Sequence, residues 1–181
     1  AFYHAGQVCV STKRIFVPAS RMDEFAKLVT EKAKALKVGD PKSKDTEVGP
    51  LIRAGEVVRI DQWVKDAVAA GAKLLCGGNV IAPTYYEPTV LLNPPLDAKV
   101  SCDEIFGPVV CLYSYENIDD AIKIANSLPL AFQAAVFAKD IDIALHAVKQ
   151  LNATAVMVND HTAFRVDWMP FGGRGDSGVG M

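Results

Sequence analysis

Hydrophobic side chains recur at helical spacing in two stretches of the first half of the chain. The first stretch follows Ser20, whose hydroxyl we expect to cap the opening turn of a helix, and it stops at Gly39 and Pro41. The second stretch ends at Gly71, a residue type that often terminates helices. The apolar positions are Met22, Phe25, Leu28, Val29 and Leu36 in the first stretch and Val57, Ile60, Val64 and Ala67 in the second. We therefore predict two amphipathic helices.

Other apolar runs lack helical spacing and predict β-strands. One run begins at residue 12 and ends at Pro18, and another, over residues 85–92, contains Pro88 and is therefore expected at the edge of a sheet. In the second half, Asn117 is placed to cap a helix over residues 118–127. The remaining predictions are strands at 72–76, 109–115, 132–138 and 153–159, a helix at 140–151, and the end of a helix at residues 1–7.

This alternation of strands and helices predicts the fold class. Strands joined by helices of about ten residues need crossover connections, which place successive strands parallel to one another. The sequence therefore predicts an α/β fold with a largely parallel sheet flanked by helices. No stretch is polar and long enough to act as a linker, so we expect residues 1–181 to form one domain.

Composition and charge narrow the classes of function. The 181 residues include 19 basic and 21 acidic side chains, and the net charge of −2 argues against a nucleic-acid partner. No run of about 18 apolar residues indicates a membrane span, and no signal peptide is visible. Four cysteines without zinc-site or disulfide spacing indicate a reduced, cytoplasmic compartment. Because the chain begins on Ala1, we expect a processed product or a piece of a longer protein.

Cys9 is the first candidate for chemistry. It stands in the stretch HAGQVCVS, between small and polar residues, at the expected passage from a helix to a strand. A thiol in such an irregular segment can face a cleft, and its thiolate is a nucleophile. Packing is the alternative, and it is the role expected for Cys76 and Cys111 in their apolar runs and for Cys102. His4 is not an evident partner for the Cys9 thiol.

Two further segments are candidates for ligand binding. CDEIFGPVV, residues 102–110, precedes a buried strand, where ligands often bind in α/β sheets, although an acidic surface turn is the alternative. NDHTAFRVDWMPFGGRGDSGVG, residues 159–180, is a long glycine-rich loop with aromatic residues and an arginine, which favours function. Its GRGDSG stretch matches a dinucleotide-binding pattern, but too little chain follows for the helix and strand which that pattern needs. Its Arg-Gly-Asp tripeptide is a chance match.

Together these segments resemble the aldehyde dehydrogenase family, in order and along the whole chain. The stretches that carry the resemblance are GQVC, VGDPKSKDTEVGPLI, GAKLLCGG, YYEPTVL, DEIFGPVV, AAVFAKDIDIAL and PFGGRGDSGVG. The resemblance implies the catalytic domain of an NAD- or NADP-dependent enzyme that oxidises a small-molecule aldehyde to a carboxylic acid. It also implies a cofactor-binding domain upstream of residue 1, an inactive isolated chain, and a full-length protein that forms a homodimer or homotetramer.

The resemblance also assigns roles to individual residues. Cys9 is the nucleophile, which forms a thiohemiacetal and then a thioester, and its backbone N–H is half of an oxyanion hole. Glu104 holds the ribose hydroxyls next to the nicotinamide, and Phe106 lies beside that ribose. Phe171 lines the substrate tunnel. No metal is implied, and the general base belongs to the missing upstream domain.

Two departures from the family pattern lie in the second half of the chain. Gly175 stands where the family often has a lysine, which puts the local contacts of its loop in doubt. Ala131 and Phe132 replace a common Gly-Leu pair, which suggests different packing before the next strand.

His161 and Arg165 lie in the region that shapes the substrate entrance in the family. An arginine there favours an aldehyde with a carboxylate, phosphate or phosphonate group, because guanidinium binds such groups in a bidentate way. Alternatively, Arg165 pairs with Asp160 or Asp167 and stabilises the loop. The segment is similar to that of lactaldehyde and phosphonate-aldehyde dehydrogenases.

Two other functions stay open: a non-catalytic domain used in assembly, and a cysteine hydrolase that acts on esters without nicotinamide.

Overall fold

The computed structural model describes residues 1–179 and divides into two compact units. The first unit spans Ala1–Glu116 and the second Asn117–Met181, and each has its own strands and helices. Both contain parallel strands joined by helical connections, so the predicted α/β class is confirmed. The single domain expected over residues 1–181 stays a prediction.

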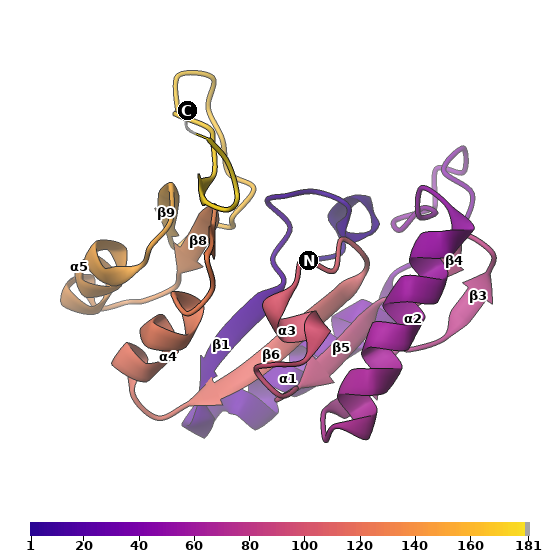
Figure 1. The fold of residues 1–181 in the computed structure, drawn as a ribbon, viewed down its shortest axis with the longest axis horizontal. Helices are drawn as coiled ribbons and strands as arrows, with labels where there is room; N and C mark the ends of the chain where they lie inside the picture. Colours follow the sequence, from indigo (N-terminus) through magenta and orange to yellow (C-terminus); the bar gives the residue numbers. More distant parts are fainter. Residues whose placement is uncertain (180–181) are drawn as a thin grey trace. The chain divides into compact units, whose positions relative to one another are not determined.

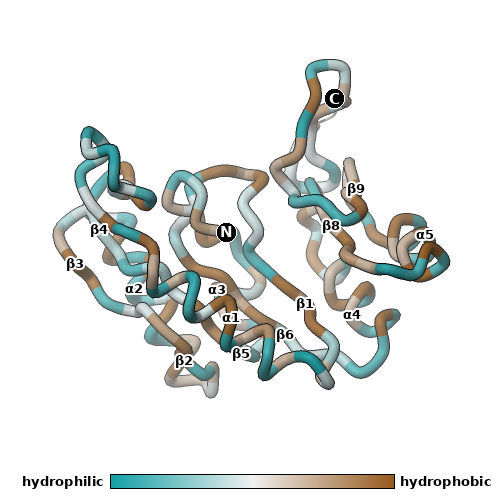
Figure 2. Tube along the Cα trace, turned by 180° about the vertical axis from the view of Figure 1, so that it is seen from behind, coloured by the Kyte–Doolittle hydropathy of each residue, from teal (hydrophilic) through white to brown (hydrophobic). Residues whose placement is uncertain are grey.

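The main sheet of the first unit has four strands. Their order is β1 (Arg14–Pro18), β6 (Val109–Tyr115), β5 (Thr89–Leu92) and β2 (Lys73–Cys76). β1, β6 and β5 run parallel, whereas β2 runs antiparallel to β5. The sheet is therefore largely parallel, as predicted, and its inner strands β5 and β6 are drawn largely in the brown of hydrophobic residues in Figure 2.

The predicted edge position of residues 85–92 is wrong. These residues form two strands, β4 (Tyr85–Tyr86) and β5, and Pro88 lies between them. β4 pairs with β3 (Val80–Ala82), whereas β5 lies between β6 and β2 in the interior of the main sheet. Because Pro88 precedes the first ladder residue of β5, its missing N–H removes no hydrogen bond between strands.

Helices cover both faces of the main sheet. α2 (Ala54–Ala69) lies on one face, where Ile60 belongs to the same buried cluster as Cys111. α1 (Met22–Ala35) lies on the other face, in a cluster that contains Val110. Neighbouring residues of a strand point to opposite faces, and Figure 1 shows the two helices on opposite sides of the sheet. The four apolar positions predicted for α2 are all buried.

Both ends of α1 differ from the prediction. The helix begins after a 3₁₀ turn, η2 (Ala19–Arg21), and no side chain caps it, so the predicted cap by Ser20 is wrong. Ser20 lies within the 3₁₀ turn, one residue too early to reach the free amides as an N-cap. The helix ends before Gly39, because the chain becomes extended and Val38 pairs with Val48.

The second unit contains the predicted strand–helix–strand crossover. β8 (Gln133–Val136) and β9 (Ala155–Val158) run parallel and are joined by α5 (Ile141–Gln150). α4 (Ile118–Ala125) precedes them, and the Asn117 side chain accepts a hydrogen bond from a backbone amide of its first turn at 2.9 Å. The predicted cap by Asn117 is therefore confirmed.

A further strand pair in the second unit has no counterpart in the sequence predictions. β7 (Leu130–Ala131) pairs antiparallel with β10 (Arg174–Gly175), and each strand is two residues long. This pair attaches the end of the glycine-rich segment to the residues that precede β8.

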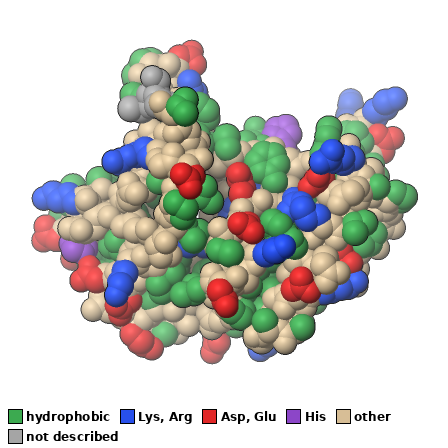
Figure 3. All heavy atoms as spheres, viewed as in Figure 1, with side chains coloured by type: hydrophobic (Ala, Val, Ile, Leu, Met, Phe, Trp, Pro, Cys, Tyr) green, Lys and Arg blue, Asp and Glu red, His purple; other side chains and the backbone are tan. Residues whose placement is uncertain are grey.

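Acidic and basic side chains are interspersed on the face of the molecule drawn in Figure 3. Over residues 1–179, no helix combines the length and the apolar character needed to cross a bilayer. The same described residues include no group of three or more His, Cys, Asp and Glu side chains placed to hold a metal ion.

Candidate active site

Cys9 lies in a tight turn that precedes β1. The Ser11 amide donates a hydrogen bond to the Val8 carbonyl at 2.9 Å, so Cys9 and Val10 occupy the central positions of the turn. The Cys9 side chain is exposed. Its thiol lies outside the core and is open to a reactant that approaches the first unit.

The other three cysteines have different surroundings. Cys76 and Cys111 are buried, as predicted, with exposed fractions of 7% and 2%. Burial raises the pKa of the Cys111 thiol to about 12 and also raises the pKa of Cys76. Cys102 is partly buried. Of the four thiols, Cys9 is therefore the one best placed to react.

The backbone that leads to Cys9 is not the end of an α-helix, so that prediction is wrong. η1 (Tyr3–Gly6) is a 3₁₀ turn in which His4 and Ala5 have φ of 47° and 55°. This left-handed conformation cannot continue a right-handed helix. The chain instead reverses direction before it reaches the cysteine.

Gly6 makes a close backbone contact possible. Its φ is +71°, and a Cβ at this position would lie 1.9 Å from the Gly107 carbonyl oxygen. Only glycine fits such a contact without displacing one of the two backbones. The glycine of GQVC therefore lets the cysteine segment lie directly against the loop that contains Glu104.

Glu104 and Phe106 lie in the loop between α3 (Lys99–Cys102) and β6. Both side chains are exposed, whereas Ile105 between them is 2% exposed and belongs to the core. Burial of Ile105 turns its two neighbours outward. Phe106 has φ +47°, a conformation that costs a non-glycine residue about 1–3 kcal/mol.

Lys13 lies between the cysteine segment and this loop. Its Nζ donates a hydrogen bond to the Gly6 carbonyl at 2.5 Å and lies 5.8 Å from the centroid of the Phe106 ring. Burial lowers the pKa of Lys13 to about 8, and the Glu104 carboxylate opposes part of that shift. Lys13 was not among the residues predicted from the sequence, although its place between Cys9 and a predicted strand was a usable signal.

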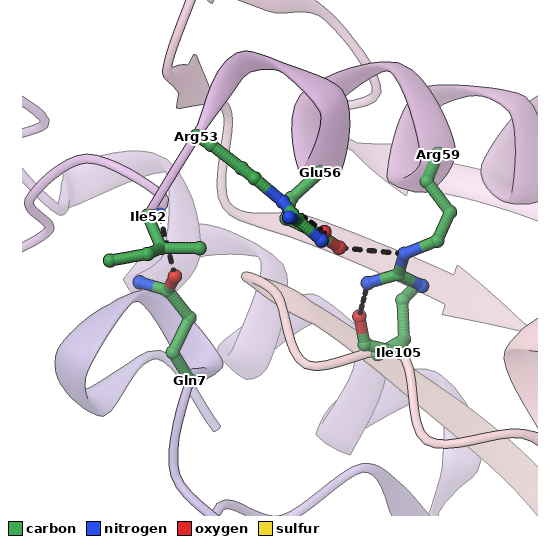
Figure 4. A network of polar contacts seen from close by, with 6 residues as sticks. All are labelled: Gln7, Ile52, Arg53, Glu56, Arg59 and Ile105. Carbon is green, nitrogen blue, oxygen red and sulfur yellow. Dashed lines mark hydrogen bonds and ion pairs between the residues drawn. The ribbon is translucent and has the colours of Figure 1, made fainter.

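Gln7 attaches the cysteine segment to the residues that lead into α2. Its Nε2 donates a hydrogen bond to the Pro50 carbonyl at 3.2 Å. Its Oε1 accepts one from the Ile52 amide at 2.9 Å, a contact drawn in Figure 4. A side-chain amide bonded at both its nitrogen and its oxygen is held in one orientation. The first unit therefore brings Cys9, Glu104 and Phe106 into a single region.

The second unit contains the other three predicted site residues. The Arg165 guanidinium lies 4.4 Å from the centroid of the Phe171 ring, a cation–π contact. Phe171 in turn meets Phe132 edge to face, with ring centroids 5.0 Å apart. Arg165 forms no ion pair with Asp160 or Asp167 within the described residues, so the loop-bracing alternative is not the arrangement observed.

His161 faces its own segment. Its Nε2 lies 3.8 Å from Asp160, and its Nδ1 accepts a hydrogen bond from the Ala163 amide at 3.1 Å. The side chain is exposed. The structure therefore shows a local role for His161, which shapes the turn that leads toward Arg165.

The departures from the family pattern lie at the β7–β10 pair. Gly175 has φ +58°, and a Cβ there would lie 2.3 Å from the Pro129 carbonyl oxygen, so a lysine does not fit this local backbone. The Ala131 amide donates a hydrogen bond to the Ser177 hydroxyl oxygen at 3.0 Å. Phe132 is the residue that contacts Phe171. The contacts at Gly175, Ala131 and Phe132 thus attach the glycine-rich loop to the residues before β8, and their difference from the family stays a prediction.

Comparison with known proteins identifies the family. A model of the aldehyde dehydrogenase family matches residues 1–181, the whole chain. The chain belongs to this family. It is 40% identical over 180 residues to the 3-sulfolactaldehyde dehydrogenase of Priestia aryabhattai. The aligned region covers 99% of this chain and 38% of that enzyme.

Solved structures of aldehyde dehydrogenases share the fold. One is an aldehyde dehydrogenase from Physcomitrella patens in complex with the reaction product succinate, with a TM-score of 0.95 at 40% identity. The superposed region covers 98% of this chain and 37% of the chain from Physcomitrella patens. Another, the glyceraldehyde-3-phosphate dehydrogenase GapN from Methanocaldococcus jannaschii complexed with NADP, has a TM-score of 0.92 at 37% identity, over 97% and 38% of the two chains. This chain therefore spans less than two fifths of these relatives.

The described residues fit a nicotinamide cofactor. The Glu104 carboxylate is exposed and forms no ion pair within residues 1–179, so both its oxygens can accept hydrogen bonds from neighbouring hydroxyls. Phe106, two residues on, offers a ring that is 39% exposed. These two side chains would hold the ribose and nicotinamide end of the cofactor.

Proposed function

We propose that the protein containing this chain is an NAD- or NADP-dependent aldehyde dehydrogenase that oxidises an anionic aldehyde to a carboxylic acid. The observation that carries the proposal is the exposed Cys9 thiol in a turn held against the loop of Glu104 and Phe106. The contact between Gly6 and Gly107 holds the two segments together. Membership of the aldehyde dehydrogenase family supports the assignment of an oxidation.

In this reaction the Cys9 thiolate adds to the carbonyl carbon of the aldehyde. A C–S bond forms, and the carbonyl oxygen becomes an oxyanion that accepts a hydrogen bond from the Cys9 backbone N–H. Such a donor contributes about 3 kcal/mol in the transition state. A bound NAD(P)⁺ would supply the acceptor for the hydride that leaves the same carbon. Cys9 would then carry a thioester, and water breaks its C–S bond to release the carboxylate, a proton and the free thiol.

Glu104 and Phe106 serve the hydride step by orientation. A carboxylate with two free oxygens can bind two hydroxyl groups at once and so restrict rotation of the ribose. The Phe106 ring, turned outward by burial of Ile105, limits movement on one side. Orientation of this kind supplies much of the rate enhancement when a bound group must meet a reacting carbon.

Arg165 favours an anionic group on the aldehyde. Its guanidinium lies on Phe171 and is not neutralised by Asp160 or Asp167, so its N–H donors are available to a ligand. The relatives named above act on or release compounds with a sulfonate, a phosphate or carboxylates. A guanidinium can bind each of these groups through two hydrogen bonds.

Substitution of Cys9 by serine in the full-length protein tests the proposal. Because a hydroxyl does not ionise at neutral pH as a thiol does, Cys9→Ser should lower kcat for NAD(P)H formation by about four orders of magnitude. Cys102→Ser, which changes a thiol outside the turn, should keep most of the activity. NAD(P)H formation that survives in Cys9→Ser would remove Cys9 from its role.

The same experiment separates the two other functions. A cysteine hydrolase would cleave esters but form no NAD(P)H with any aldehyde. An assembly domain would leave Cys9 of the wild-type protein unreactive toward iodoacetamide. The cytoplasmic location and the homodimer or homotetramer stay predictions, which fractionation of cells and light scattering of the full-length protein would test.

A further inference from the structure

Arg59 on α2 is bonded to the backbone between the two proposed cofactor residues. Its Nη2 donates a hydrogen bond to the Ile105 carbonyl at 2.6 Å, and Ile105 separates Glu104 from Phe106. Figure 4 shows the guanidinium reaching from the helix to this carbonyl. The contact joins residues 46 positions apart in the sequence.

This hydrogen bond acts on the peptide that sets the conformation of Phe106. The Ile105 carbonyl belongs to the planar unit before Phe106, so its direction constrains φ of that residue. The value is +47°, which an aromatic residue adopts only when its surroundings impose it. A charge-assisted hydrogen bond from a fixed guanidinium is a contact of that kind.

Arg59 is held in place before any ligand arrives. Its Nε donates a hydrogen bond to Glu56 at 2.8 Å, and its guanidinium lies 4.4 Å from the centroid of the Trp63 ring. Arg53 bonds the other carboxylate oxygen of Glu56. Hydrogen bonds from Arg59 and Arg53 lower the pKa of Glu56, which keeps the carboxylate charged. The arginine is therefore anchored on two sides.

The helix also fixes the next residue of the loop. A Cβ on Gly107 would lie 2.3 Å from Cδ1 of Ile60, the neighbour of Arg59 on α2. Gly107 therefore lies directly on the helix, while Arg59 holds the carbonyl two residues before it. Two successive side chains of α2 thus determine where the loop runs.

We propose that Arg59 is a positioning residue for the cofactor. Through the Ile105 carbonyl, it sets the loop so that Glu104 and Phe106 face the nicotinamide ribose. The inference rests on the proposed function. Arg59 itself bonds the Ile105 carbonyl and acts on the cofactor through Glu104 and Phe106, the residues on either side of Ile105.

The test compares Arg59→Met with Arg53→Met in the full-length protein. Arg53 is a matched control, because it binds the same Glu56 but has a side chain that is 75% exposed. Arg59→Met should raise the Kd of NAD(P)⁺ by about tenfold, as expected for loss of a hydrogen bond from a charged donor. Without cofactor, amide hydrogen exchange in residues 103–107 should also be about tenfold faster. Alkylation of Cys9 and the KM for aldehyde should change by less than about twofold.

Arg59→Lys should recover part of both losses, because an ammonium can donate to a carbonyl but cannot reproduce the planar fork that also binds Glu56. Equal Kd values and equal exchange rates in Arg59→Met and Arg53→Met would overturn the proposal. If Arg59→Met does not fold, Glu56→Gln takes its place, because it loosens Arg59 without removing its donors. Glu56→Gln must then raise the Kd of NAD(P)⁺ and the exchange rates of residues 103–107, and unchanged values would overturn the proposal.

The outcome is separable from that of the proposed function. If the wild-type protein forms no NAD(P)H with any aldehyde, the proposed function fails. The exchange rates of residues 103–107 in the two arginine variants would still decide whether Arg59 positions the loop.

Discussion

The two regions that hold the predicted site residues are built differently. The cysteine–cofactor region, residues 4–13 with 103–107, belongs to the first unit, and the substrate segment, residues 159–179, belongs to the second. The first is held by contacts between residues far apart in the sequence. The second has local hydrogen bonds in its middle and is attached to distant residues at its two ends.

In the cysteine–cofactor region, the connections between the elements span long stretches of chain. Gly6 lies against Gly107, Gln7 bonds the backbone at residues 50 and 52, and Arg59 bonds the carbonyl of Ile105. Because these contacts start from the cysteine segment, the loop and α2, a shift of one element would disturb the other two.

In the middle of the substrate segment, local hydrogen bonds shape the chain. His161 accepts one from Ala163, and the Met169 amide donates to Val166. Connections to more distant residues occur where Asn159 bonds the backbone of Ala138, at the β7–β10 pair, and through the ring of Phe171. Trp168, in the middle of the segment, is 85% exposed.

The difference fits the tasks proposed for the two regions. Bond formation at Cys9 and orientation of the cofactor are needed for every substrate, and both require fixed geometry. Recognition of one aldehyde rather than another can rest on a segment that changes without disturbing the core. The departures from the family pattern at Gly175, Ala131 and Phe132 all lie in or against the substrate segment.

Gly6→Ala should have the largest effect on stability and activity, because it disrupts the contact between Gly6 and Gly107 in the cysteine–cofactor region. A methyl group at φ +71° and 1.9 Å from the Gly107 oxygen must push the two backbones apart. We expect a loss of about 2–4 kcal/mol in the free energy of unfolding and a strong fall in NAD(P)H formation. Gly55→Ala, where no atom lies within 4 Å, should be neutral or stabilising.

Gly175→Ala provides the comparison within the substrate segment. It faces a similar clash, 2.3 Å from the Pro129 oxygen at φ +58°. Its effect should appear in KM for the aldehyde and leave alkylation of Cys9 unchanged. Equal damage to Cys9 reactivity in Gly6→Ala and Gly175→Ala would break the distinction between the two regions.

Arg165→Ala should give an intermediate effect that depends on the substrate. Loss of a hydrogen bond to a charged group should lower kcat/KM for carboxylate-, sulfonate- or phosphate-bearing aldehydes by about 1.5–3 kcal/mol. Neutral aldehydes of similar size should be nearly unaffected. Arg165→Lys should recover part of the loss, because an ammonium lacks the planar fork. Equal losses for charged and neutral aldehydes would end the idea of anion recognition.

Lys13 should affect the stability of the protein rather than catalysis, and the effect should depend on pH. Its pKa of about 8 lies below the ordinary 10.5, so the folded protein releases this proton first as pH rises. As pH rises from about 8 to 10.5, the free energy of unfolding of the wild type should therefore increase relative to that of Lys13→Met. This gain should be lost again as pH falls through about 8. We expect the difference in Tm between the two proteins to change by several °C in favour of the wild type.

Lys13→Arg is the control for this titration. An arginine keeps its charge throughout the window, so its Tm difference from Lys13→Met should not depend on pH. If the Tm of the wild type changed with pH in the same way as the Tm of Lys13→Arg, the Lys13 ammonium would not be desolvated. Lys13 would then not connect the cysteine segment with the loop of Glu104 as the structure indicates.

Features governed by neighbours in the sequence were predicted well. The buried face of α2 follows from apolar spacing, the start of α4 from the cap of Asn117, and the burial of Cys76 and Cys111 from their apolar runs. Their positions in the chain specify their surroundings, because helix periodicity and capping act over a few residues. The family motifs also assign Cys9, Glu104 and Phe106 to one site, and the roles of these residues stay predictions.

Contacts between distant residues were decided by the tertiary structure alone. The left-handed backbone at residues 4–6, the interior position of β5 behind Pro88, and the β7–β10 pair each depend on a partner that local spacing does not reveal. The hydrogen bond from Arg59 to Ile105 and the lowered pKa of Lys13 are of the same kind. Local pattern determines which elements form and which face they bury, whereas the orientation of a carbonyl or the desolvation of an ammonium exists only once those elements have packed together.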